Sequence, residues 1–320
     1  MQTSLWRKGI VFGIMILFLV TNIGSSDESS SNLMKNDMPT TSNGDTLYVG
    51  GDGPGNYSCI QDAIDNASIM DTIFVFSLSS PYYENIIIKK NGINLIGEDK
   101  KTTIIDGNSV GDVVHINTKE VKIQGFTIQN SGLNFYSYNH DAGVSIYHSP
   151  LNTNVTVTDT IITNNSVGIH LSFAQNNIIF KNIIINNKYG IHVIGDSPHN
   201  TFSENIIENN SYAIDIHLSD DQVITNNSIA HNSQIGINII GSGSNTIQNN
   251  NFIDNGDDVY FYIRLNIDKK PARWINNYWD TWNGYFPMLI KGRATLWLMG
   301  YIQFPWFNFD WRPAQEPYDI

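Results

Sequence analysis

The sequence is poor in cysteine, in positive charge and in long apolar runs, and each shortage excludes a class of protein. Cys59 is the only cysteine among 320 residues, so no disulfide can form within the chain and packing must stabilise the fold. Lys and Arg number 18 against 30 Asp and Glu, a net charge of −12. This balance excludes nucleic acid as an expected partner, because phosphate binding needs clustered basic residues. An acidic surface instead suits solubility and cation binding.

The one long apolar run lies near the N-terminus and is typical of an export signal. Two basic residues precede the apolar residues 9–20, and small residues at 24–26 suit cleavage. This run is shorter than the about 20 residues that a membrane span needs. We therefore expect residues 1–25 to be a signal peptide and the polar residues 26–44 to be a disordered linker. The chain would then be extracellular, surface-displayed or periplasmic, touching a membrane only if the signal remains as an uncleaved anchor.

A repeat of 22–23 residues runs through the second half of the chain. One column of the repeat is formed by Asn154, Asn177, Asn200, Gln222 and Asn245. A second column is formed by Asn165, Asn187, Asn210, Asn232 and Asn255, and a third by Gly168, Gly190, Ala213, Gly236 and Asp258. Each copy holds two or three apolar runs of strand length separated by Asn and Gly, which leaves no room for a pair of helices.

This period predicts an all-β fold, a single-stranded right-handed parallel β-helix over residues 45–273. One coil cannot bury its own apolar face, but stacked coils pair strand upon strand about 4.8 Å apart. We expect the asparagines at each corner to adopt the left-handed backbone of a tight bend, and their amides to hydrogen-bond from coil to coil. Residues 72–262 would supply roughly eight or nine coils.

Both ends of such a solenoid need caps, because open strand edges invite aggregation. At the N-terminal end Ser58 and Gln61 fit a capping box, and one apolar helical face is formed by Ile60, Ala63, Ile64 and Ala67. The sequence therefore predicts a short capping helix. Residues 274–320 hold six of the seven tryptophans and are predicted to form an aromatic C-terminal cap. A partner-docking or membrane-contacting surface is the alternative for this aromatic segment.

A polar column runs along the strand that follows the third column of the repeat. Because alternate residues of a strand face opposite ways, the aliphatic residues of GIHL, GIHV, AIDI and GINI point inward and the residue between them points outward. The outward column places His170, His192 and Asp215 on three successive coils, with His217 on the same sheet. These four residues are the predicted metal ligands, for copper or zinc. The alternative is an exposed polar face without a ligand.

A long insertion separates residues 130 and 143, where other coils have a short link. It carries the predicted carbohydrate-binding residues Phe135, Tyr136, Tyr138, His140 and Asp141, because aromatic rings can stack on the apolar faces of sugars. The alternative is that the insertion only covers the coil beneath it. Turn carboxylates that could pair for glycoside hydrolysis are Asp196, Asp220 and Asp221, but no residue is singled out as catalytic.

Two stretches of the chain resemble known β-helix proteins. Residues 47–75, LYVGGDGPGNYSCIQDAIDNASIMDTIFV, and the following YYENIIIKKNGINLIGEDKKTTIIDG resemble the N-terminal part of pectin methylesterases. The later coils and the segment NNYWDTW are similar to the family named after the periplasmic copper-binding protein NosD and to archaeal surface proteins. The resemblance covers about residues 45–320 and implies the fold. After GFTIQNS the Gln-Ala strand and the Asp-Phe-Gly segment of the methylesterases are absent, so esterase activity is not expected.

Together these observations predict an exported, non-catalytic binding scaffold that contacts a glycan or a surface protein through its outward sheet. Two alternatives stay open at this point. One is a polysaccharide-active enzyme, a hydrolase or a lyase, for which the turn carboxylates and the aromatic insertion argue. The other is a metal-handling accessory protein, for which the histidine column argues and which the resemblance to the copper-binding family also implies.

Overall fold

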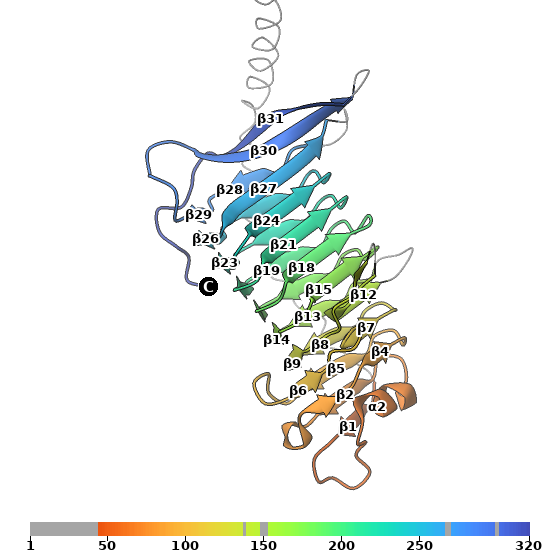
Figure 1. The fold of residues 1–320 in the computed structure, drawn as a ribbon. Coiled ribbons are helices and arrows are strands. Elements are labelled where there is room, and N and C mark those ends of the chain that lie inside the picture. Colours follow the sequence, from red (N-terminus) through yellow and green to blue (C-terminus); the bar gives the residue numbers. More distant parts are fainter. Residues whose placement is uncertain (1–43, 137–138, 148–152, 266–269, 298–300) are drawn as a thin grey trace, which may run out of the picture. The chain divides into compact units, whose positions relative to one another are not determined.

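The chain winds into stacked coils whose strands line three faces, as Figure 1 shows. The computed structural model describes residues 44–320 apart from 137–138, 148–152, 266–269 and 298–300. The first face contains β1 (Thr46–Val49), β2 (Thr72–Val75), β5 (Asn94–Gly97), β8 (Lys122–Gln124), β13 (Thr156–Thr158), β16 (Ile178–Phe180), β19 (Thr201–Ser203), β22 (Val223–Thr225), β25 (Thr246–Gln248) and β28 (Arg273–Ile275).

The other two faces complete each coil. The second face contains β4 (Ile86–Ile88), β7 (Val114–Ile116), β12 (Ala142–Tyr147), β15 (Val167–Ser172), β18 (Tyr189–Ile194), β21 (Tyr212–His217), β24 (Ile235–Ile240), β27 (Asp257–Arg264) and β30 (Met288–Trp297). The third face contains β3 (Tyr82–Tyr83), β6 (Ile104–Asp106), β9 (Thr127–Gln129), β14 (Ile161–Thr163), β17 (Ile183–Ile185), β20 (Ile206–Glu208), β23 (Ser228–Ala230), β26 (Asn251–Ile253) and β29 (Tyr278–Trp279). The predicted parallel β-helix is confirmed.

The core is a set of aliphatic columns that run from coil to coil. On the second face Ile169 pairs with Ile191, which pairs with Ile214, and all three are fully buried. The third face carries a matching column of Ile162, Ile184, Ile207 and Ile229. Each fully buried side chain of this size contributes about 1.5–3 kcal/mol relative to an exposed one. Repetition of one small contact, coil after coil, therefore stabilises the fold without disulfides.

Three asparagine ladders tie the corners of successive coils together. The middle ladder runs through Asn182, Asn205, Asn227, Asn250 and Asn277, and each side-chain amide oxygen accepts the backbone N–H of its counterpart one coil earlier. The two predicted amide columns are ladders as well, as the bonds from Asn187 to Asn210 and from Asn177 to Asn200 show. The middle ladder was not among the columns predicted from the repeat.

The expected backbone conformation of the ladder residues is wrong. Apart from Asn154, the left-handed residue is the one that precedes each ladder position, such as Asn164 before Asn165 and Asn209 before Asn210. The ladder side chain must point inward along the coil axis to reach its neighbour, so the preceding residue makes the bend. That position is less selective than the ladder position, since Lys181 and Glu204 also occupy it.

The single α-helix in the described part of the chain, α2 (Ile60–Asn66), packs over the first coil, and a short 3-10 helix, η1 (Ser77–Ser79), follows β2. Ile60, Ala63 and Ile64 are buried beneath α2, as predicted. The predicted capping box of Ser58 and Gln61 is wrong, because no side chain of the N-cap residue bonds to the helix. Instead the carboxylate of Glu84 accepts the backbone N–H groups of Ile60 and Gln61 at 2.8 and 2.9 Å. A carboxylate at this end also complements the helix dipole.

A long antiparallel pair covers the C-terminal end of the coils. β30 continues the second face beyond β27, and β31 (Tyr301–Asp310) runs antiparallel to β30 over ten residue pairs. Trp274 and Trp279 are buried beneath this end, and Phe252 stacks on Trp279 at 4.2 Å between ring centroids. Trp274, Trp279 and Phe252 thus fill the last coils, whereas Tyr285, Phe286 and Trp311 of the same region are exposed.

The predicted signal peptide and most of the predicted linker lie outside the described residues. Among the described residues, no helix has the length and apolar character needed to cross a membrane.

Candidate metal centre

The predicted outward column exists, and its register is the one expected. Cα pairing on the second face joins Ser145 to His170, His170 to His192, His192 to Asp215 and Asp215 to Asn238. His217 lies two residues beyond Asp215 near the end of β21, so its side chain projects from the same side of the sheet. Alternation along each strand therefore brings the four predicted metal ligands onto one surface.

The predicted exposure of this column is wrong, because the insertion covers it. Residues 131–136 and 139–141, here called the strap, contain the short antiparallel strands β10 (Phe135–Tyr136) and β11 (Asn139–His140). The strap brings the imidazole of His140 to 4.9 Å from the rings of both His170 and His192, centroid to centroid. His140, His170, His192 and Asp215 are each less than 5% exposed. A fifth ligand candidate, His140, thus comes from a segment 30 residues before His170 in the sequence.

A stack of aromatic rings closes one side of the histidine cluster. Phe135 stacks on His140 at 3.9 Å and on Tyr189 at 4.8 Å, and Tyr189 stacks on Tyr212 at 4.8 Å. The ammonium group of Lys188 lies 4.7 Å from the Phe135 ring centroid, within the range of a cation–π contact. This aromatic wall fixes the strap to the sheet and places an apolar boundary beside the imidazoles. Burial raises the pKa of Tyr189 to about 12, so its hydroxyl keeps its proton.

The cluster offers two sets of three ligands that share one residue. The inner triad consists of His140, His170 and His192, and the outer triad of His192, Asp215 and His217. Within each triad the ligand atoms lie within 4.8 Å of one another. Nitrogen atoms bound to one ion at 2.0–2.1 Å are at most about 4.2 Å apart, so small side-chain movements would bring either triad onto an ion.

Asp215 is the single carboxylate of the cluster and connects its two halves. Its oxygens lie 3.4 Å from Nε2 of His192 and 2.9 Å from Nε2 of His217, and Oδ1 also accepts a hydrogen bond from the Asn238 amide at 2.7 Å. These contacts hold the carboxylate in one orientation. An oriented carboxylate beside imidazoles is the usual second support of a metal site, and it can also be a ligand itself.

Burial favours the neutral form of two imidazoles of the inner triad, His192 and His140. Desolvation lowers the pKa of His192 well below its ordinary value, and the neighbouring His170, His140 and His217 lower it further. Desolvation also lowers the pKa of His140, although the charge of Asp215 opposes this shift. A neutral imidazole is the form that coordinates metal ions. The lowered pKa values of His192 and His140 therefore favour the form of these two residues that can bind an ion.

The donor set fits copper or zinc. Imidazole nitrogens suit both ions, and one carboxylate completes a mixed N and O set. Nδ1 of His140 and Nδ1 of His192 are buried and have no hydrogen-bond partner. A buried polar atom left without a partner costs about 1–3 kcal/mol, which a bound ion would remove. His140, His170 and His192 would hold the ion, with Asp215 and His217 within reach.

The other predicted sugar-contacting residues fall in different places. Phe135 faces the aromatic wall, while Asp141 closes the base of the strap by accepting the Asn134 N–H at 2.8 Å. Tyr136 belongs to β10, and Tyr138 lies outside the described residues. The turn carboxylates Asp196 and Asp221 have left-handed backbone, and Asp220 accepts the N–H of Gly243 at 2.6 Å. These three carboxylates thus occupy structural turn positions.

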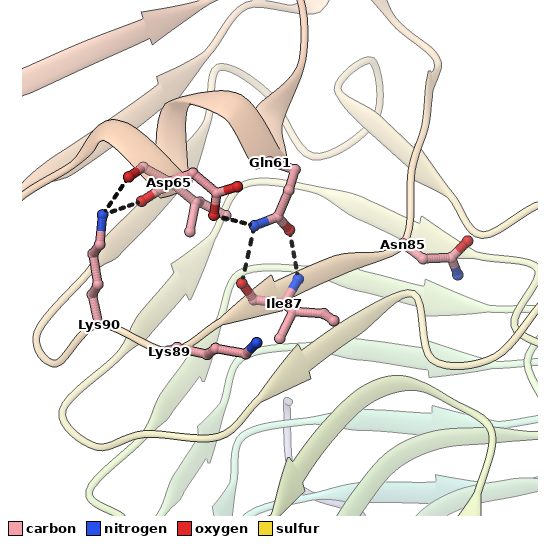
Figure 2. Close-up of a pocket in the computed structure, with 7 residues that line it drawn as sticks. Gln61, Asp65, Asn85, Ile87, Lys89 and Lys90 are labelled. Carbon is pink, nitrogen blue, oxygen red and sulfur yellow. Dashed lines mark hydrogen bonds between the residues drawn. The ribbon is translucent and has the colours of Figure 1, made fainter.

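Two open hollows lie at the N-terminal end, away from the cluster. Figure 2 shows the one beside α2, where Gln61 bonds to both backbone groups of Ile87 and the ammonium of Lys90 bonds to carbonyl oxygens at the end of the helix. Its polar groups thus serve to attach the helix to the coil. The second hollow, of about 430 Å³, is lined by Tyr48, Gly51, Asp52, Gly53, Asn56, Phe76, Leu78 and Glu98.

Most of the chain matches one known protein family. The family described as periplasmic copper-binding protein (NosD) matches residues 64–285, which is more than half of the chain. This chain belongs to the NosD family. The match includes every residue of the two triads.

Other similar proteins share parts of the sequence or the fold. A 73-residue segment is 42% identical to the Arabidopsis thaliana protein named probable pectinesterase/pectinesterase inhibitor 12, covering 21% of this chain and only 13% of that protein. The structure of XylC with xylose superposes with a TM-score of 0.58 at 11% identity, over 73% of this chain and 67% of that one. Pectate lyase Pel9A gives 0.51 at 15% identity, over 74% and 80%. The mannuronan C-5 epimerase AlgE4 A-module of Azotobacter vinelandii gives 0.52 at 16% identity, over 72% and 76%. These structural likenesses show the fold alone.

The position of His140 beside the histidine column and the aromatic wall were not predictable from the sequence. The sequence predicts sugar contact for His140 because it lies in an aromatic insertion, with no repeat partner to indicate its direction. Tyr189 and Tyr212 occupy matching positions of successive repeats and pair on the second face. An aromatic residue repeated at this position, next to Phe135 in the strap, is the signal that could have indicated where the strap docks.

Proposed function

We propose that this chain is an exported metal-handling protein that carries copper(II) or zinc(II) as cargo in its buried histidine cluster. The observation that carries the proposal is the inner triad, three buried imidazoles from two coils and the strap whose ligand atoms lie within 4.8 Å. A structural role alone would not require three polar rings to be packed together in a desolvated space, because moving polar groups out of water has a cost in free energy. Membership of the NosD family supports the choice of copper.

Calorimetric titration with copper(II) and zinc(II) tests this function. Asn238 already occupies the same column one coil beyond Asp215, so asparagine is a compatible replacement for a column histidine. The purified protein should bind one ion, and His170→Asn/His192→Asn should weaken binding by roughly 100-fold or more, since even outer-shell changes cost about 10- to 100-fold. His231→Asn, a half-exposed histidine paired with Asp254, is the matched control. Equal binding by wild type and double variant, or affinity weaker than about 0.1 mM, would refute the proposal.

Glycan binding is a second candidate, and the hollow at the N-terminal end favours it. Tyr48 and Phe76 stack there with ring centroids 6.0 Å apart, and Tyr48 is 46% exposed. The side chains of Asp52, Asn56 and Glu98 line the same hollow and offer hydrogen-bond acceptors to sugar hydroxyls. An exposed aromatic face flanked by such groups is a common setting for sugar rings. XylC with xylose and pectate lyase Pel9A, whose names refer to sugars, share the fold.

A screen of soluble polysaccharides by calorimetry and by product analysis tests the second candidate. Saturable binding that Tyr48→Ala removes would support a non-catalytic glycan contact at this hollow. Tyr83→Ala, which removes another exposed tyrosine, provides the control. Release of reducing or unsaturated sugar would instead indicate an enzyme, and no binding by any polymer would contradict the candidate.

A further inference from the structure

The burial of the cluster residues is graded from one end to the other. His170, His192 and Asp215 have side chains that are almost completely buried, whereas the side chain of His217 is 31% exposed. His140, contributed by the strap, is 3% exposed. The outer triad therefore contains the one ligand candidate of the cluster that water reaches freely, and the inner triad contains none.

The residues that surround the cluster leave the end at His217 open to solvent. The strap covers the inner triad, and the stack of Phe135, Tyr189 and Tyr212 closes the side at the start of the strands. His217 lies at the opposite end of β21 from Tyr212. His192 belongs to both triads, so a ligand exchange at this residue connects the exposed triad with the buried one.

Resting on the proposed metal-handling function, we propose that the two triads act in series, the outer one as the port and the inner one as the holding site. His217 and Asp215 receive an incoming copper(II) or zinc(II) ion from solution. His192 then remains a ligand while His170 and His140 replace Asp215 and His217. Each replacement exchanges one donor atom for another, so no redox partner and no net change of charge in the protein are needed. Release follows the same route in reverse.

Stopped-flow mixing of copper(II) with the purified protein, followed by competition with an indicator chelator, separates the two roles. His217→Asn should slow association and dissociation together by about 10-fold or more while changing the equilibrium affinity by less than about 3-fold, because a port affects both rates. His140→Asn should weaken the equilibrium affinity and accelerate dissociation while leaving association close to wild type. His231→Asn should change neither rate, and circular dichroism of each variant checks that it folds.

Three results would overturn the series arrangement. Wild-type association rates in His217→Asn would remove the port. Two ions that load independently would show separate sites rather than a route. Failure of the wild-type protein to bind any ion would remove the proposed function itself and this inference with it, an outcome that the calorimetric stoichiometry distinguishes from the first two.

Discussion

At the scale of single residues, the histidines of the inner triad combine a polar side chain with a desolvated position. In the metal-free protein this combination has a cost that depends on pH. Burial and neighbouring histidines lower the pKa of His192 well below its value of about 6.5 in an unfolded chain. The unfolded chain therefore takes up a proton at this residue at a higher pH than the folded chain does, and His140 adds an effect of the same sign.

We predict that the metal-free protein loses stability as the pH falls from about 7 to 5, below the unfolded pKa of histidine near 6.5. Above that pH both states are neutral at these residues, so stability should be independent of their titration. The midpoint of urea unfolding, measured with chelator present, checks this expectation. In His192→Asn the decrease should be smaller. A midpoint that stays constant over this range in the wild type would show that the imidazoles are not desolvated.

The column could be predicted from the sequence, but its burial could not. Strand alternation within a regular repeat determines the direction of His170, His192 and Asp215, and pairing in register confirms it. Burial depends on His140 and Phe135, which lie in a segment without a repeat partner. No local pattern indicates where such a segment docks, because its position depends on contacts with residues about 30 to 54 positions away.

At the scale of structural elements, Phe135 makes the central aromatic contacts between the strap and the coils. Its ring contacts Tyr189, His140 and the ammonium of Lys188. Aromatic pairs of this kind contribute about 0.5–1.5 kcal/mol beyond the area that they bury. Loss of this ring should therefore release the strap, and with it the His140 ligand, while the coils beneath stay folded.

We predict that Phe135→Ala accelerates metal dissociation by roughly 10-fold, the equivalent of about 1.4 kcal/mol. Amide hydrogen exchange of the strap should become faster in the same variant, while exchange in β18 stays unchanged. Leu133→Ala is the control, because Leu133 lies on the same strap but is 84% exposed. Slow dissociation retained in Phe135→Ala would mean that the strap does not depend on the aromatic wall.

The end of the middle asparagine ladder is a second element with a measurable role. Asp310 in β31 is fully buried, and its Oδ2 accepts the backbone N–H of Asn277, the side-chain amide of Asn277 and the indole N–H of Trp279. The last coil thus has its donors satisfied by a residue of the terminal hairpin. The carboxylate fastens that hairpin to the solenoid.

We predict that Asp310→Ala lowers the free energy of unfolding by about 3–5 kcal/mol, since each buried donor left without an acceptor costs about 1–3 kcal/mol. Asp310→Asn retains one oxygen and should lose less than half as much. Denaturant titration measures both variants, with Asp257→Ala, an exposed carboxylate, as the control. Similar losses in Asp310→Ala and Asp257→Ala would show that the hairpin is not needed to end the ladder.

The N-terminal capping helix was only partly predictable from the sequence. The helix itself was predictable from the spacing of Ile60, Ala63 and Ile64. Its N-terminal partner was not, because Glu84 reaches the helix across a coil, and a local Ser-x-x-Gln pattern suggested another partner. Likewise the middle ladder was hidden, since Asn182 and Asn205 stand among many other asparagines of the repeat.

At the scale of the whole described unit, stability is a sum of contacts between neighbouring coils, as expected for a repeat protein. An ion in the inner triad would connect the strap with β15 and β18. An ion in the outer triad would connect β18 with β21. The stabilisation should then be local rather than uniform. Ligand at about 100 times Kd contributes about 2.7 kcal/mol to a folded state that binds it.

We predict that zinc slows amide exchange in β15, β18 and β21 far more than in β2 and β5, at the other end of the solenoid. Hydrogen exchange with mass spectrometry, with and without zinc, measures the difference by segment. The double variant His170→Asn/His192→Asn should show no such change. Equal protection along the whole solenoid would indicate that the coils unfold as one unit and that local coupling is weak.

Because the register of the second face is uniform, the coil on which a residue lies determines its position along the polar column. Ser145 and Asn238 occupy the column on either side of the cluster and pair directly with His170 and Asp215. A ligand can therefore be gained, lost or moved by one coil through a point substitution, with the backbone unchanged. The insertion packs against His170 and His192, so its place affects which positions of the column are shielded from water. In evolutionary terms, such a fold lets the choice of ligand and the choice of its cover change independently.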